Sequence, residues 1–181
     1  MDNSFVTFEQ ARFLHVMGVD IPTNYVYTVH GNFISIDKLY NETSYLAPKL
    51  ADVNQWLWEF YRVIIEIHYY GCNNIAYEIK GSQIESLNSR YCLQCLNSPN
   101  DALRRGLDEV IDLINSDKII SEAERLFRDM FKSAEEYGFK ELYEKMKEFK
   151  ENPYNLPGSE NYRRMVLGDF QREICDLYNK V

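Results

Sequence analysis

Two different periods of hydrophobic and polar residues alternate along residues 1–115. Apolar residues three or four positions apart, the period of an amphipathic helix, follow Thr7, recur over residues 51–61 and return after Ser98. Apolar residues two positions apart, the period of a strand with one buried face, occupy residues 25–29, 33–37, 63–70 and 75–79. This order predicts an α+β fold in which helices cover one face of a mostly antiparallel four-stranded sheet.

Capping and turn residues mark the ends of these elements. Thr7 and Gln10 have the spacing of a capping box at a helix N-terminus, and Gly18 suits the left-handed position that ends the same helix. The three residues 30–32, His-Gly-Asn, are typical of a short hairpin loop. Ser98, which is followed by proline, predicts the start of the last helix of this part.

After this part of the chain only the helical period remains. Apolar positions recur at helical spacing over residues 119–134 and 139–149, and a proline-containing loop leads to Ser159, which caps a last helix. Charges of both signs become denser, which is typical of solvated helix faces. We therefore expect an α+β domain at residues 1–115 and an all-helical extension of three helices at residues 116–181.

Composition and charge narrow the classes of partner. The 181 residues carry a formal net charge of −8 with a pI near 5.0, and general binding to the nucleic-acid backbone needs clustered lysines and arginines instead. The N-terminus lacks the basic and apolar regions of a secretory signal, and no apolar run approaches the length of a membrane span. We expect a cytoplasmic protein that binds neither membranes nor nucleic acid and whose cysteines stay reduced.

A zinc site is one hypothesis for the cysteines. Cys92 and Cys95 have the Cys-x-x-Cys spacing of half a zinc site, and His68 and Cys72 flank the end of the third predicted strand. A zinc ribbon needs two such knuckles and only one is present, while a redox pair would lie at a helix N-terminus rather than ahead of Ser98. Small semi-buried cysteines are the favoured interpretation, and we expect no bound metal and no cofactor.

A second cluster follows from the alternation of side chains along the third and fourth strands. Glu66 and His68 point to the face opposite Ile65, and Glu78 and Lys80 point to the same open face from the next strand. Two carboxylates and an imidazole could exchange protons with a substrate or hold a metal ion. Cross-strand pairing on a solvated face is the favoured interpretation, because no nucleophile or glycine-rich loop accompanies the cluster.

Surplus apolar surface makes the chain a candidate for binding another protein or a second copy of itself. The last helix carries an apolar stripe that includes Met165, Phe170 and Leu177. A small three-helix unit should lean on another surface, and two-fold dimers are the commonest oligomers. Trp58 points away from the buried stripe of its own helix. We expect its own chain to cover it, whereas an exposed Trp58 would be a partner-binding hot spot.

Three segments of the first domain share a pattern with a known group of proteins. They are TFEQARFLHVMGVDIPTNYVYTV, YLAPKLADVNQWLWEFYRVIIEIHYY and NDALRRGLDEVIDLI. Over residues 5–115 this pattern resembles small uncharacterised α+β proteins encoded by bacteriophages and mobile elements of gut bacteria. The resemblance implies no particular activity and assigns no functional residue, and the helices after Asp117 depart from it.

These observations favour a non-enzymatic, phage-type accessory protein that binds a protein partner in the cytoplasm. From the resemblance alone, inhibition of a host or defence protein is the expected role of such binding. No Walker loop and no Gly-x-Gly-x-x-Gly, Gly-x-Ser-x-Gly or His-Glu-x-x-His motif is present. Two alternatives stay open. One is a small-ligand or nucleotide-binding protein with a pocket between sheet and helices. The other is a metal-assisted enzyme that uses Glu66, His68 and Glu78.

Overall fold

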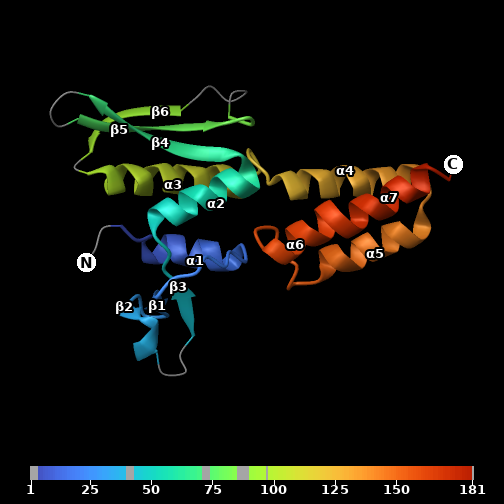
Figure 1. The fold of residues 1–181 in the computed structure, drawn as a ribbon, viewed down its shortest axis with the longest axis horizontal. Helices are drawn as coiled ribbons and strands as arrows, with labels where there is room; N and C mark the ends of the chain where they lie inside the picture. Colours follow the sequence, from blue (N-terminus) through green and yellow to red (C-terminus); the bar gives the residue numbers. More distant parts are fainter. Residues whose placement is uncertain (1–3, 40–42, 71–73, 85–89, 97, 181) are drawn as a thin grey trace. The chain divides into compact units, whose positions relative to one another are not determined.

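The computed structural model describes residues 4–39, 43–70, 74–84, 90–96 and 98–180 (Figure 1). The chain forms two compact units. The first consists of Met1–His15 and Asp20–Ile119, and the second of Val16–Val19 and Ile120–Val181. The units are described one at a time below.

The first unit begins with a helix and a small antiparallel sheet. Helix α1 (Phe8–Val16) starts at the predicted capping box, in which the backbone N–H groups of Gln10 and Thr7 donate to each other's side chains, at 3.3 and 3.0 Å. The sheet has the order β2-β1-β3, and a loop with Gly31 at a φ of 80° joins its first two strands. The strands are β1 (Tyr25–Thr28), β2 (Phe33–Ser35) and β3 (Ser44–Leu46), and a short 3-10 turn, η1 (Ile36–Lys38), follows β2.

A second antiparallel sheet, with helices packed on one of its faces, forms the rest of this unit. Its order is β4-β5-β6, and the strands are β4 (Val63–Tyr70), β5 (Asn74–Gly81) and β6 (Arg90–Leu96). The helices are α2 (Leu50–Tyr61) and α3 (Pro99–Asn115). Helix α3 approaches the sheet at Gly106, where a Cβ atom would lie only 2.5 Å from Ile65 Cγ2. Val63, Ile65, Tyr77 and Ile79 are buried. Helices α2 and α3 lie on the same side of this sheet, and we call the side that carries no helix of this unit the open face (Figure 1).

The predicted α+β class is confirmed, but the single four-stranded sheet is wrong. The hairpin of β1 and β2 pairs with β3 rather than with β4, so the strands among the described residues form two three-stranded sheets. Two strands were missed. β3 has only three residues, which is too short to show alternation, and the sequence of β6, RYCLQCL, does not alternate regularly between apolar and polar residues.

The second unit is helical, as expected. Ser121 and Ser159 cap its first and last helices by accepting hydrogen bonds from Glu124 N and Tyr162 N. The last helix changes from α to π geometry and back without a break. The elements are α4 (Glu122–Glu136), α5 (Lys140–Glu151), α6 (Glu160–Arg164), the π segment η3 (Met165–Phe170) and α7 (Gln171–Tyr178).

One apolar core holds these helices together. The last helix contributes residues spaced four apart, Tyr162, Val166, Phe170 and Ile174, none more than 5 % exposed. They pack against Phe127 and the other buried positions of α4 and α5. Within the described part of the chain, no helix has both the length and the apolar character needed to cross a membrane.

Candidate functional site

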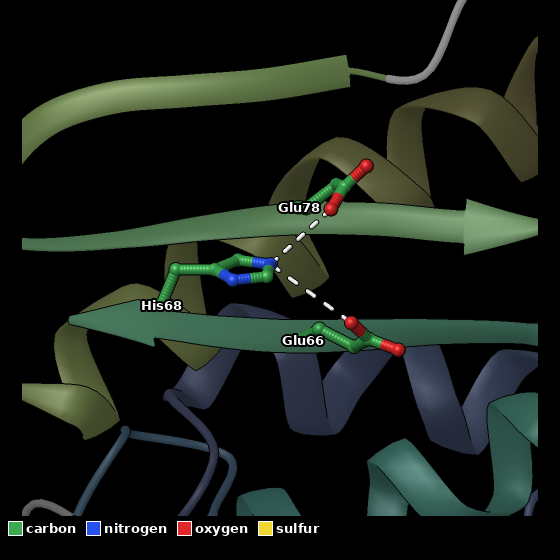
Figure 2. Close-up of side chains that lie close together, drawn as sticks. All are labelled: Glu66, His68 and Glu78. Atoms are coloured by element: carbon green, nitrogen blue, oxygen red, sulfur yellow. Dashed lines mark ion pairs between the residues drawn. The ribbon is translucent and has the colours of Figure 1, made fainter. Parts of the chain in front are cut away.

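The pairing of β4 with β5 brings four charged or titratable side chains together on the open face of the larger sheet. Glu66 lies directly opposite Glu78, Lys80 lies opposite Ile64, and His68 is two residues along β4 from Glu66. Figure 2 shows the His68 ring reaching toward both carboxylates, with one carboxylate from each strand. The strand alternation had placed these four residues on one face, and the structure brings all four into contact.

One oxygen from each carboxylate is shared between two cationic or imidazole groups. Lys80 Nζ lies 2.7 Å from Glu66 Oε2 and 3.2 Å from Glu78 Oε2. His68 Nε2 lies 3.2 Å from Glu78 Oε2 and 3.9 Å from Glu66 Oε2. The hydrogen bonds that Lys80 donates to Glu66 and Glu78 raise the pKa of the Lys80 ammonium group.

The cluster is partly open to solvent. Glu66 and Lys80 keep 41 % and 44 % of their side-chain surface, whereas Glu78 keeps 18 %. Ion pairs this exposed are screened by solvent and add little to folding stability. A histidine nitrogen and two carboxylate oxygens within 4.8 Å of one another are also a potential set of metal ligands. The arrangement can therefore bind a cation or exchange a proton, and its effect on folding stability is small.

The proposed zinc set falls largely outside the described residues. Cys72 and the side chains of Cys92 and Cys95 lie outside that part of the structure. His68, the remaining member, directs its Nε2 atom at Glu66 and Glu78 (Figure 2).

Trp58 lies on the exposed side of α2, and the expectation that its own chain covers it is wrong. Its side chain is 44 % exposed. The guanidinium carbon of Arg62 lies 5.9 Å from the centre of the indole ring, within the range of a cation–π interaction. Ala51, Gln55, Trp58 and Arg62, at helical spacing, form an exposed stripe that we call the α2 face.

The other predicted partner-binding residues lie in the helical unit and are mostly covered by it. Phe170 is only 5 % exposed, and its ring packs against Phe127 and Phe149 with centroid separations of 6.1 and 5.2 Å. Met165 and Leu177 are half-buried. The apolar stripe of the last helix therefore fills the core of its own unit, and a partner cannot reach Phe170 in the folded chain.

A hollow in the first unit was not anticipated from the sequence. It has a volume of about 350 Å³ and lies beside the start of α2. Its lining residues are Phe5, Pro22, Thr23, Asn24, Tyr25, Lys49 and Asp52. They come from three separate segments and share no period or motif, so no sequence signal could have assembled them. The predicted ligand pocket between sheet and helical extension stays a prediction.

Comparisons with protein-family models, with curated proteins and with solved structures gave no match for this chain. The resemblance to phage-encoded proteins and the function inferred from it therefore stay predictions, and the geometry of the chain itself has to support any functional proposal.

Proposed function

We propose that this protein acts by binding another protein and that the α2 face, centred on Trp58, is its main contact surface. The observation that supports the proposal is the 44 % exposure of Trp58 on a regular helix. Tryptophan and arginine are the residues most enriched at binding hot spots, because both bury a large planar group against a partner. Trp58, near the end of α2, and Arg62, the left-handed residue that caps this helix, supply such a pair.

The α2 face is rigid because the opposite side of the helix packs into the core of the first unit. The opposite side of α2 contributes Val53, Leu57 and Phe60 to the core. Asn54 accepts a hydrogen bond from Ile65 N at 2.9 Å and donates one to Ile65 O at 3.0 Å, which ties α2 to the edge of β4. A preorganised surface loses less conformational entropy on binding. Most of the free energy from burying Trp58 therefore contributes to affinity.

The proposed class of partner rests on the resemblance described in the sequence analysis. The resemblance of residues 5–115 to proteins of phages and mobile elements favours a protein of the host or of its defence systems, bound in the cytoplasm. Such an accessory protein inhibits by occupying a surface and needs no catalytic group.

The test is capture of partners from the producing cell with the wild-type chain, followed by affinity measurement with purified partner. We expect Trp58→Ala to weaken binding by about 30-fold, the loss that a hot-spot residue gives. Tyr154→Ala is the matched control, because it removes an aromatic side chain that is 85 % exposed and lies outside the α2 face. Equal binding by both variants would contradict the proposal.

Tryptophan fluorescence gives a second readout. The chain has two tryptophans, of which Trp56 is 6 % and Trp58 is 44 % exposed. We expect bound partner to protect Trp58 from an aqueous quencher and to leave the emission of a Trp58→Phe variant unchanged.

A further inference from the structure

We infer that Glu66, His68 and Glu78 form a binding site for a divalent transition-metal ion on the open face of the β4-β5-β6 sheet, and that Lys80 occupies this site when no metal is bound. The inference does not depend on the proposed protein-binding function, because the α2 face shares no residue with this cluster.

The ligand geometry is the first step. Zinc bonds imidazole nitrogen and carboxylate oxygen at about 2.0–2.2 Å, so the ligand atoms of one ion lie within about 4.4 Å of each other. His68 Nε2 is 3.2 Å from Glu78 Oε2 and 3.9 Å from Glu66 Oε2. The three potential ligand atoms already lie within 4.8 Å of one another. Small rotations of the Glu66 and Glu78 side chains would bring their carboxylate oxygens and His68 Nε2 to bonding distance from one ion.

The second step is the position of the two carboxylates. Glu66 and Glu78 face each other directly across β4 and β5. Like charges in this position destabilise a sheet, and a cation between them removes the repulsion. In this structure the Lys80 ammonium group neutralises the two carboxylates, from which it lies 2.7 and 3.2 Å away. The strand register thus creates a cation-binding position, which the ammonium group fills.

Lys80 can leave this position. Its side chain is 44 % exposed, and four rotatable bonds let the ammonium group move into solvent. A divalent ion brings twice the charge and can bond to the imidazole as well, which an ammonium group cannot do. Metal binding therefore exchanges two exposed ion pairs of Lys80 for three coordinate bonds.

The donor set selects the class of ion. One imidazole nitrogen with two carboxylate oxygens suits zinc and its neighbours in the first transition series, whereas magnesium and calcium prefer oxygen ligands alone. Three protein ligands leave at least one coordination position for water on the solvent side, as in open metal sites. The chain's own competing ammonium group keeps the affinity of the wild-type protein modest.

The experiment titrates the full-length protein with Zn²⁺ and follows the imidazole signals of its three histidines by NMR. We expect the His68 signals to shift and those of His15 and His30 to stay in place. Lys80→Met should bind Zn²⁺ about five- to tenfold more tightly than the wild type, because it removes the competing ammonium group. Glu78→Gln should bind at least about tenfold more weakly, because it removes one ligand.

Lys145→Met is the matched control. It removes the same charge and an equally short ion pair, 2.7 Å from Glu173, in the other unit, so it should leave Zn²⁺ affinity at the wild-type value. Equal affinities of the Lys80→Met and Lys145→Met variants would overturn the inference, since they would show an effect of net charge alone.

The cysteines need a separate readout. Co²⁺ bound through thiolates gives an intense near-ultraviolet charge-transfer band that nitrogen and oxygen ligands do not give. We expect no such band in the Lys80→Met variant at one equivalent of Co²⁺, together with a perturbed His68 signal. A thiolate band with unperturbed His68 would place the metal on the cysteines and overturn the inference.

Discussion

The phenol of Tyr162 donates a hydrogen bond to the Glu124 carboxylate inside the helical unit, and Arg128 Nε pairs with the other carboxylate oxygen at 2.8 Å. Tyr162 is 4 % exposed. Burial, and secondarily the hydrogen bond and charge of Glu124, raise the pKa of Tyr162 well above that of a free tyrosine. A deprotonated Tyr162 would place a second negative charge beside Glu124, so the folded helical unit strongly favours the neutral phenol.

This pKa difference makes stability fall at high pH. Below about pH 10, the ordinary tyrosine pKa, Tyr162 is protonated in both the folded and the unfolded chain. Its full contribution to the free energy of unfolding is then present. Above that pH the unfolded chain loses the proton while the folded chain keeps it. We expect the stability difference between wild type and Tyr162→Phe to shrink by about 1.4 kcal/mol per pH unit there. Denaturant titrations followed by circular dichroism between pH 8 and about pH 11 measure it. Tyr154→Phe, at an 85 % exposed position, should show the wild-type slope.

At the residue scale, the sequence predicted which side chains share one face of a strand, because this depends only on local alternation. Glu66, His68, Glu78 and Lys80 were placed on one face because side chains alternate along a strand, and the structure has them in contact. Tyr162 and Glu124 were not paired in advance, because 38 positions separate them and only the packing of α4 against α6 brings them together. Trp58 was wrongly expected to be covered, because the helical period shows which side faces outward but not what lies beyond it.

At the scale of an element, Phe170 is one of the residues through which the last helix packs on α4 and α5. Its ring is surrounded by Phe127 and Phe149. We expect Phe170→Asp to unfold the helical unit, since an unpaired buried carboxylate together with a lost aromatic ring destabilises by about 3–5 kcal/mol. Loss of helical circular dichroism with retained Trp56 emission would report this outcome.

The same substitution separates two roles of the stripe. Tyr178→Asp is the control, because that side chain is 40 % exposed and should tolerate a charge. If Phe170→Asp instead kept its helical signal and changed only the sedimentation of the protein, Phe170 would belong to an interface between chains and our assignment to the core would be wrong.

The helices were the elements that the sequence predicted best, whereas the seven-residue β6 was missed although the three-residue β2 was predicted. The helices of the second unit run for a dozen residues or more, or continue one another, so their apolar period repeats several times. The three residues of β3 complete no period. The division into two sheets was also beyond the sequence, because β1 and β4 are both apolar strands and nothing local decides which of them β3 joins.

At the scale of the whole molecule, the chain enters the second unit twice, first for four residues and later for the helices. Residues Val16–Val19 belong by their contacts to the helical unit, although they lie between two parts of the first unit. Gly158 N donates a hydrogen bond to Met17 O at 3.0 Å, and Gly18, at a φ of 75°, has no room for a Cβ atom beside Leu156. A cut after Ile119 therefore leaves this short segment without the residues it packs against.

We expect residues 1–119 expressed alone to remain folded with mixed α/β circular dichroism, because the core of the first unit is formed by its own residues. The loss should be confined to residues 16–19. Amide hydrogen exchange measures it, since protection should persist in α2, α3 and β4 and disappear around Gly18. A fragment without cooperative unfolding would show that the two units fold only together.

The π segment of the last helix has a consequence for how this helix tolerates insertions and deletions. Residues four apart drift by about 40° per step around an α-helix, so Tyr162 and Ile174, twelve residues apart, would differ by about 120°. Both are nonetheless buried in one core, because the wider π turn between them absorbs one residue. Eleven residues of uninterrupted α-helix would give a difference of only about 20°. The helix thus carries one residue more than its packing requires. A deletion at Gly168, where no atom lies within 4 Å of a would-be Cβ, would remove this extra residue and restore a continuous α-helix.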